Sequence, residues 1–335
     1  MTNFKRHFAA LAAGIAATAL LAGAALADPA VLYDGGGKYD KGFNESAFNG
    51  ATRWAEETGG TFGEMDLTAG DAQREQSLRQ FAERGYAPIL VPGFNWEEAI
   101  RTVSAEFPET QFVIIDAFVD LPNVKSYVFK EQEGSYLVGV MAAMASKTGT
   151  VGVIPAFNFP LLEAFACGYK LGVLSVNPDA KVLWNYIGAG FEAFNDPAKG
   201  TEVANTQIDQ GADVVFAVAG GAGNGALQAA ADRGVLGIGV DQNQNYMHPD
   251  NMLTSMQKKV DVATYEAFKS FEPGKLQTGL SLLGVAEGGV GPAFDEFNEK
   301  HVTPEMKAAV DEATAKIISG EIQVHDFRSD NACPV

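Results

Sequence analysis

The sequence predicts an α/β protein built from two similar lobes, each a parallel sheet covered by helices. Short apolar segments alternate with segments of helical spacing along most of the chain, as in repeated βαβ units. Residues 84–94 and 210–220 each place an apolar strand after a glycine. Residues 111–116 and 236–241 repeat at nearly the same offset, and both end in aspartate. Two matched offsets favour a duplicated lobe over a chance likeness between βα units.

The first residues have the features of a secretory signal peptide. Lys5 and Arg6 precede an apolar stretch rich in Ala and Leu that ends in Ala25-Leu26-Ala27. We expect cleavage before Asp28 rather than a membrane anchor, because no cationic flank follows the apolar stretch. The remaining chain, residues 28–335, is long enough for two lobes with cores of their own.

The first lobe is expected to begin directly after this segment. Its strands are AVLY (30–33), TFGEMDL (61–67), PILV (88–91) and QFVIID (111–116). Helical spacing occupies residues 44–58, 71–84 and 96–106 between them.

The second lobe repeats this alternation. Its expected strands are TVGVI (150–154), KVLWNYIG (181–188), DVVFAV (213–218) and LGIGV (236–240), with helices near 159–175, 197–210 and 223–233. Asp196 as N-cap and Pro197 at the first helical position mark one helix start.

Ligands of open parallel sheets bind beyond the carboxyl ends of the strands. Residues suited to such a site stand at or just past six strand ends: Asp34, Gly93, Asp116, Gly188, Gly220 and Asp241. If the lobes face each other, these turns line one cleft.

The net charge disfavours one class of partner, and the cysteines leave one structural question open. The net charge is −18, and loss of Lys5 and Arg6 with the signal peptide makes it −20, which disfavours nucleic acid as a partner. Cys167 lies in an apolar helical stretch, so we expect a buried small apolar residue there, while a bond to Cys333 stays open.

The sequence does not match the common dinucleotide-binding, phosphate-binding, zinc-protease or serine-hydrolase motifs. The glycines at 35–37 do not begin a dinucleotide-binding motif, because Asp40 stands where its last glycine belongs, and a P-loop would need glycine in place of Leu32. The four histidines lack metal-ligand spacing, and neither H-E-x-x-H nor G-x-S-x-G occurs. We therefore expect no catalytic residues, no metal and no cofactor. The glycines of 219–226 suit either backbone contacts to a ligand or close helix packing.

The expected turns carry aromatic and polar side chains instead. They are Tyr39, Asp40, Phe43 and Asn44 in the first turn, Phe94 and Trp96 in the third, and Phe191 and Phe194 in the second lobe. Aromatic faces on both sides of a cleft suit a flat ring, and Asp116 or Asp241 suits a sugar diol. Each residue also has a structural interpretation: Phe43 could pack beneath the first helix, and Asp116 could cap the next element.

Taken together, eight ordered stretches resemble the basic membrane protein family of substrate-binding proteins for ABC importers. They are DKGFNESAFNGA (40–51), FVIIDAFVDLPNV (112–124), FKEQEGSYLVGVMAAMASKTGTVGVI (129–154), FACGYKLGV (165–173), NDPAKGTEVA (195–204), QGADVVFAVAGGAGNGALQAA (210–230), IGVDQNQN (238–245) and LTSMQKKVD (253–261). The resemblance implies a type I periplasmic-binding-protein fold with two Rossmann-like lobes and three crossover strands, near 125–130, 253–257 and 278–284. Lobe I would comprise 28–127 and 256–280, and lobe II 128–255 and 281–330.

The resemblance also implies site residues. Phe43 resembles the aromatic that stacks on one face of a nucleoside base, with Asp40 and Asn44 beside it. Phe194 resembles the aromatic on the other face. Asp241 resembles the carboxylate that binds the ribose hydroxyls, with Lys258 as the ammonium near it, and Asp116 and Gly220 are further candidates. On physical grounds a buried carboxylate needs a partner, and Lys258 could supply it to Asp241 while also donating to the sugar.

The function implied is that of a periplasmic, monomeric receptor that binds a small ring-bearing ligand, most simply a purine nucleoside, and delivers it to an ABC permease in the inner membrane. The alternatives are a nucleoside or sugar hydrolase, and a receptor for a membrane signalling protein. The sequence departs from its relatives at Asn95-Trp96 and at 157–159, both expected to face the cleft, which leaves the ligand open.

Overall fold

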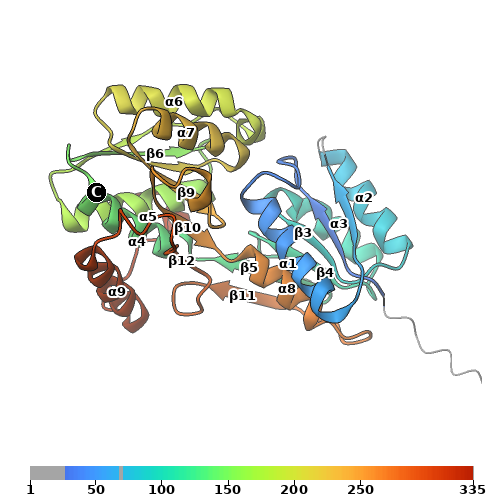
Figure 1. Ribbon diagram of the computed structural model, residues 1–335. Helices are drawn as coiled ribbons and strands as arrows, with labels where there is room; N and C mark the ends of the chain where they lie inside the picture. Colours follow the sequence, from blue (N-terminus) through green and yellow to red (C-terminus); the bar gives the residue numbers. More distant parts are fainter. Residues whose placement is uncertain (1–26, 68–70, 335) are drawn as a thin grey trace, which may run out of the picture.

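The chain folds into two α/β lobes that lie side by side and are joined by three chain segments (Figure 1). The structure is a computed structural model that describes residues 27–67 and 71–334. The expected signal peptide therefore lies outside the described residues, except for Ala27. Within the described part of the chain, no helix is long and apolar enough to cross a membrane.

Lobe I contains a six-stranded parallel sheet in the order β11-β5-β4-β3-β1-β2. The strands are β1 (Ala30–Tyr33), β2 (Gly63–Asp66), β3 (Ile89–Pro92), β4 (Phe112–Ile115), β5 (Val124–Phe129) and β11 (Gly279–Leu283). The helices are α1 (Phe43–Thr58), α2 (Asp71–Glu83), α3 (Glu97–Glu106) and α8 (Val260–Lys269).

The central strands of lobe I are buried on both faces, as a sheet covered on two sides requires. Leu32 faces a core shared with α2 and α3, while Val31 faces the opposite core, to which Ala47 of α1 belongs. Because successive side chains enter one core or the other, the sequences of these strands are continuously apolar.

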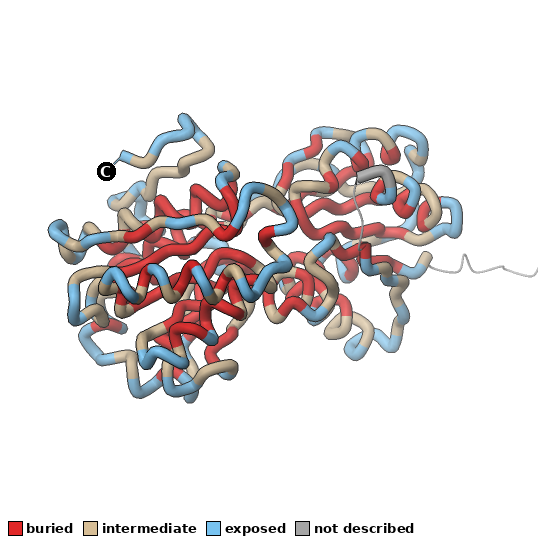
Figure 2. The backbone as a smooth tube through the Cα atoms, turned by 90° about the horizontal axis from the view of Figure 1, so that it is seen from above, coloured by how far each residue is buried: buried red, intermediate tan, exposed pale blue. Residues whose placement is uncertain are grey.

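Lobe II repeats the arrangement with a sheet in the order β12-β10-β9-β8-β6-β7, in which only β12 runs antiparallel. The strands are β6 (Thr150–Pro155), β7 (Lys181–Trp184), β8 (Val214–Val218), β9 (Leu236–Asp241), β10 (Met252–Lys258) and β12 (Val290–Pro292). The helices are α4 (Glu131–Ala145), α5 (Pro160–Val176), α6 (Pro197–Asp209), α7 (Gly220–Asp232) and α9 (Pro304–Ser319). Short 3-10 turns are η1 (Phe94–Trp96), η2 (Phe191–Asn195), η3 (Asn245–Met247) and η4 (Phe327–Ser329). Buried strands run through the centre of both lobes (Figure 2).

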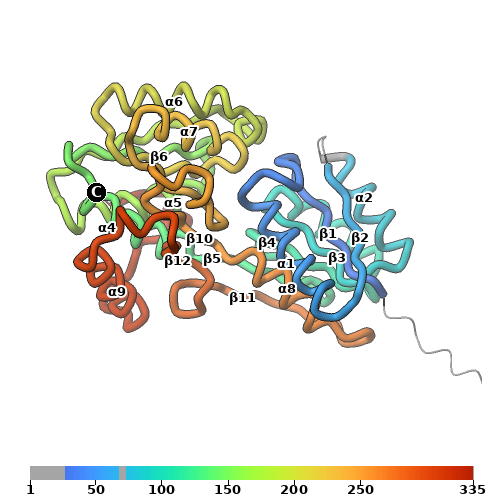
Figure 3. The backbone as a smooth tube through the Cα atoms, viewed as in Figure 1, coloured from blue at the N-terminus to red at the C-terminus, as the bar shows by residue number. Residues whose placement is uncertain are grey.

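The chain passes between the lobes three times (Figure 3). It crosses at Lys130 between β5 and α4, at Lys259 between β10 and α8, and over residues 284–289 between β11 and β12. The expected boundaries at 127, 255 and 280 each fall inside a strand, because β5, β10 and β11 pair fully within one sheet before the chain leaves it. By this pairing, residues 252–258 lie in lobe II and 279–283 in lobe I.

Cys167 is fully buried in α5, as its apolar surroundings predict, but its interpretation as a simple apolar residue is wrong. It forms a disulfide with Cys333, and the two Cα atoms lie 5.7 Å apart. The bond fastens the C-terminal segment to lobe II.

Candidate ligand-binding site

A cavity lies between the lobes, at the carboxyl ends of strands from both sheets; the empty space in it, together with the open solvent at its mouth, amounts to about 600 Å³. Its walls combine carboxylates with aromatic and aliphatic side chains. All eight site residues predicted from the sequence line it: Asp40, Phe43, Asn44, Asp116, Phe194, Gly220, Asp241 and Lys258. The structure therefore brings together residues that are more than two hundred positions apart in the chain.

Asp40 shapes the wall that lobe I contributes. Its carboxylate accepts hydrogen bonds from the amides of Gly42 (2.8 Å), Asn44 (3.0 Å) and Glu45 (3.1 Å), which are otherwise unpaired at the start of α1. The Asn44 side chain donates to Asp34 (2.8 Å) and to Asp40 (3.2 Å). Burial raises the pKa of Asp40 to about 6, although the amide hydrogen bonds oppose the rise. These bonds fix Phe43, the first residue of α1, at the cavity wall.

Phe194 belongs to the wall that lobe II contributes. It lies in η2, against the first residue of α7, Gly220. Gly220 has φ +52°, and a Cβ added there would meet the Phe194 ring at 3.3 Å. Glycine therefore allows both the turn into α7 and the close approach of the aromatic ring.

Asp116 and Asp241 occupy matching places in the two lobes. They follow β4 and end β9, and both have left-handed backbones, with φ +74° and +67°. Aspartate adopts this conformation at a cost, and such residues cluster at functional sites. Both side chains point to the same cavity from opposite sheets.

The Asp241 carboxylate opens onto the cavity. No described residue donates a hydrogen bond to it, and its oxygens are not among the fully buried atoms without a partner, whereas Asp116 Oδ1 is. The residue as a whole is 8% exposed. Burial raises its pKa to about 7; Lys258 opposes the rise, and Asp116 adds to it. A buried carboxylate without donors favours a ligand that supplies them.

Lys258 lies close enough to Asp241 to affect its pKa, but the expectation that the two side chains pair is wrong. Lys258 Nζ instead donates to Asp116 Oδ2 at 2.6 Å and lies 3.1 Å from Glu131 Oε1, with all three side chains buried. Burial raises the pKa of Asp116 to about 6 against the effect of Lys258. Lys258 also lies 5.1 Å from the centre of the Phe43 ring, within cation–π range.

Aromatic rings also connect the lobes. Phe94 of lobe I lines the cavity and stacks on Phe159 of lobe II, with ring centres 4.1 Å apart and planes 14° apart. Phe191 packs on the same Phe94 ring at 5.2 Å. Trp96, by contrast, is fully buried in the lobe I core, so the expectation that it faces the cleft is wrong. It is the last residue of η1, and its side chain packs into the core shared with α2 and α3.

Direct hydrogen bonds hold the turn before α1 between the lobes. From lobe II, Asn195 Nδ2 donates to the carbonyl of Gly35 (2.7 Å), Asn224 Nδ2 to that of Asp40 (3.1 Å) and Gln244 Nε2 to that of Lys41 (2.8 Å). The structure therefore describes the lobes in a closed arrangement.

Several lining residues were not predicted. Leu161, Leu162 and Phe165 come from the start of α5 and form an apolar floor. Their helical spacing is indistinguishable from that of core residues, so the sequence offers no signal for them. No cluster that could hold a metal ion occurs in the described ranges 27–67 and 71–334.

Comparison with known proteins gives consistent results. Residues 28–327 match the family described as "ABC transporter substrate-binding protein PnrA-like". The "ABC transporter nucleoside-binding protein BmpA" of Lactococcus lactis is 31% identical, covering 96% of this chain and 99% of the relative. "Basic membrane protein A" of Borreliella afzelii is 32% identical over 85% of this chain and 87% of its own. A crystal structure of ABC transporter system solute-binding proteins from Aeropyrum pernix superposes with a TM-score of 0.80 and 31% identity, covering 91% of this chain and 95% of that one.

Proposed function

This chain belongs to the PnrA-like family of ABC transporter substrate-binding proteins, and we propose that it binds a purine nucleoside between its lobes and delivers it to a membrane permease. The family match confirms the resemblance to basic membrane proteins and the periplasmic-binding-protein fold. The Lactococcus relative is named as nucleoside-binding, and its similarity spans nearly the whole of both chains.

One observation carries the proposal: a single cavity is lined by Phe43 from lobe I, by Phe194 from lobe II, and by the carboxylate of Asp241, to which no described residue donates a hydrogen bond. The two rings offer apolar faces to a base, and each stacked base contributes ~1–3 kcal/mol. Asp241 offers charge-assisted hydrogen bonds to a ribose diol. A ligand with one flat ring and one sugar diol would stack on both Phe rings and donate hydrogen bonds to Asp241.

The charge of the cavity supports a nucleoside over a nucleotide. Four carboxylates line it, from Asp34, Asp40, Asp116 and Asp241, and Lys258 is the one cationic side chain among its described lining residues. Lys258 is already paired with two carboxylates. A phosphate would therefore enter a net negative site.

The proposed action is closure followed by docking. A ligand that contacts both lobes favours the closed arrangement by its differential affinity. In this proposal the mature chain acts in the periplasm as a monomer, after removal of residues 1–27, and the permease opens the lobes to release the ligand.

A thermal-shift screen of the mature chain tests the proposal, because a bound ligand raises the melting temperature by mass action. The screen contains guanosine, inosine, adenosine, uridine, hypoxanthine, ribose and guanosine 5′-monophosphate. Purine nucleosides should give the largest shifts, and the monophosphate should give none. A shift with ribose alone would contradict the stacking assignment.

A further inference from the structure

A chain of charges, three of them buried, runs from the cavity to the half-buried Arg328 of the C-terminal segment. Lys258 Nζ contacts Asp116 at 2.6 Å and Glu131 at 3.1 Å, and Glu131 Oε2 lies 2.9 Å from Arg328 Nη1. Asp116 and Lys258 line the cavity, while Glu131 and Arg328 do not. The chain therefore links two residues at the ligand's position to two residues behind it.

These charges lie where the chain passes between the lobes. Glu131 is the first residue of α4, one position after the first crossing, and Lys258 is the last residue of β10, one position before the second. Arg328 also donates to the carbonyl of Phe129, the last residue of β5, at 3.1 Å. The network thus contacts two of the three segments about which the lobes move.

The number of cations available to Asp116 and Glu131 determines which of these carboxylates the Lys258 ammonium pairs with. The side chains of Glu131 and Lys258 are 0% and 1% exposed, and that of Asp116 is 4% exposed. A buried carboxylate without a cation is strongly destabilising. With Lys258 alone, Asp116 and Glu131 would compete for one ammonium group, and Arg328 supplies the second cation.

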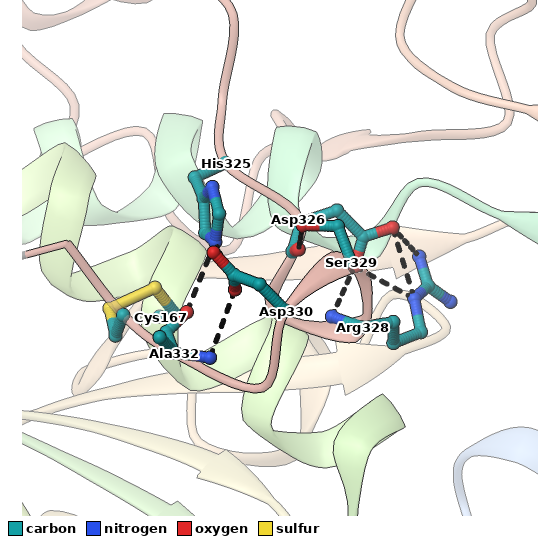
Figure 4. Close-up of a disulfide and its surroundings, with 8 residues drawn as sticks. Cys167, His325, Asp326, Arg328, Ser329, Asp330 and Ala332 are labelled. Carbon is teal, nitrogen blue, oxygen red and sulfur yellow. Dashed lines mark hydrogen bonds and ion pairs between the residues drawn. A yellow bond between two sulfur atoms is a disulfide. The ribbon is translucent and has the colours of Figure 1, made fainter.

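The second cation, the Arg328 guanidinium, belongs to the C-terminal segment. Arg328 lies in η4 and is held by the Asp326 carboxylate, which accepts from its Nε at 2.9 Å (Figure 4). Five residues later, Cys333 is bonded to Cys167 in α5. The segment is therefore fixed to lobe II by the disulfide, five residues after the guanidinium that contacts Glu131.

We propose that Glu131 and Arg328 are positioning residues of the ligand cavity: Arg328 neutralises Glu131, so that the Lys258 ammonium remains on Asp116 at the cavity wall. Neither residue touches the ligand. The C-terminal segment then contributes to affinity from outside the cavity, by setting where the only cation of the described cavity lining is placed. The inference rests on the proposed function for its choice of ligand.

Calorimetric titration with guanosine tests the inference on the full mature chain. Arg328→Gln should weaken guanosine binding about tenfold, equivalent to ~1.4 kcal/mol, because Glu131 then draws Lys258 away from Asp116. The double variant Glu131→Gln/Arg328→Gln removes the charge and its partner together, so its affinity should return to within about threefold of wild type. Arg233→Gln, at an exposed pair with Asp209, is the matched control and should bind like wild type.

Recovery of guanosine affinity in the double variant distinguishes a positioning role of Arg328 from a merely structural one. Wild-type affinity in Arg328→Gln would overturn the inference, as would a double variant as weak as the single one. Circular dichroism spectra and melting temperatures show whether each variant is folded.

A ligand-free readout keeps this test independent of the proposed function. In the NMR spectrum of the ¹⁵N-labelled lysine ammonium groups, the Lys258 signal should move in Arg328→Gln and return towards its wild-type position in the double variant. An unmoved signal overturns the inference. If the wild type binds no nucleoside, the proposed function fails, and the Lys258 signal still decides the inference.

Discussion

At the scale of single residues, the two aspartates with left-handed backbones define the cavity. Asp116 and Asp241 end equivalent strands of the two sheets, but their surroundings differ: Asp116 is paired with Lys258, and Asp241 accepts no hydrogen bond from the described residues. The duplicated lobes thus present one carboxylate that is paired with a cation through Oδ2 while its Oδ1 has no partner, and one to which no described residue donates.

Replacing either stacking residue tests the aromatic walls. Phe43→Ala and Phe194→Ala should each weaken guanosine binding roughly five- to a hundredfold, because each loses one stacked face worth ~1–3 kcal/mol. Phe48→Ala is the matched control, since Phe48 lies on the same helix as Phe43 and outside the cavity. Calorimetry measures all three, and normal affinity in both cavity variants would place the ligand elsewhere.

The titration of Asp241 gives a prediction about stability. Its pKa in the folded protein is about 7, above the ordinary value of 3.8, so the folded state binds more protons than the unfolded state between these values. The free energy of unfolding therefore falls as the pH rises through this window, when the buried carboxylate ionises. Asp241→Asn removes the cost, so it should raise the melting temperature of the ligand-free protein at about pH 8, with a gain that shrinks towards pH 4.

Thermal unfolding across this pH range checks the prediction. Asp120→Asn, on an exposed loop residue, should give no such pH-dependent gain. The Asp241 variant should also lose guanosine binding. A gain of equal size at both ends of the range would show that Asp241 is not the titrating group.

At the scale of elements, the sequence predicts most strands and helices because their patterns are local. β1 has the predicted bounds, and Asp196 accepts from the Lys199 amide at 2.9 Å as the expected N-cap of α6. α7 begins at Gly220, three residues before its expected start, because glycines are poor helix formers and concealed its first turn. α4 was not predicted, since it is buried over nearly all of its circumference and has no polar face to reveal a helical period.

The disulfide is an element-scale feature that the sequence left open. Nothing local indicates that residues 166 positions apart meet. Reduction should lower the free energy of unfolding by ~2–4 kcal/mol, because the C-terminal segment loses its covalent tie to α5. Denaturant unfolding with and without dithiothreitol measures this.

Cys333→Ser controls for other effects of the reductant. This variant should already have the lower stability and should not respond to dithiothreitol. An equal response of wild type and variant would contradict the role assigned to the bond.

At the scale of the whole molecule, the site exists only when the lobes meet. Sequence offsets predict the two lobes, and the family resemblance predicts which turns face each other. The partner of Lys258 could not be predicted, because three buried carboxylates surround one ammonium and only their positions in space decide the pairing. The Phe94–Phe159 stack joins residues from different lobes and is likewise a product of closure.

The hydrogen bonds between the lobes predict an effect on ligand release. Asn224→Ala removes the donor to the Asp40 carbonyl and should weaken guanosine binding by ~1 kcal/mol, mainly through faster dissociation, because the closed arrangement loses a contact. Gln228→Ala, on the same helix but bonded within it to Asp232, is the matched control. Stopped-flow tryptophan fluorescence measures both rates, and an unchanged dissociation rate in Asn224→Ala would contradict the closure mechanism.

The central claim is that one cavity between the lobes binds a purine nucleoside, with Asp241 as the group that needs the ligand's donors. Calorimetric titration of guanosine into the mature wild-type chain and into Asp241→Asn tests it most directly. We predict saturable binding of one guanosine per wild-type chain and little or none in the variant. Equal binding by both proteins, or no binding by the wild type, would contradict the claim.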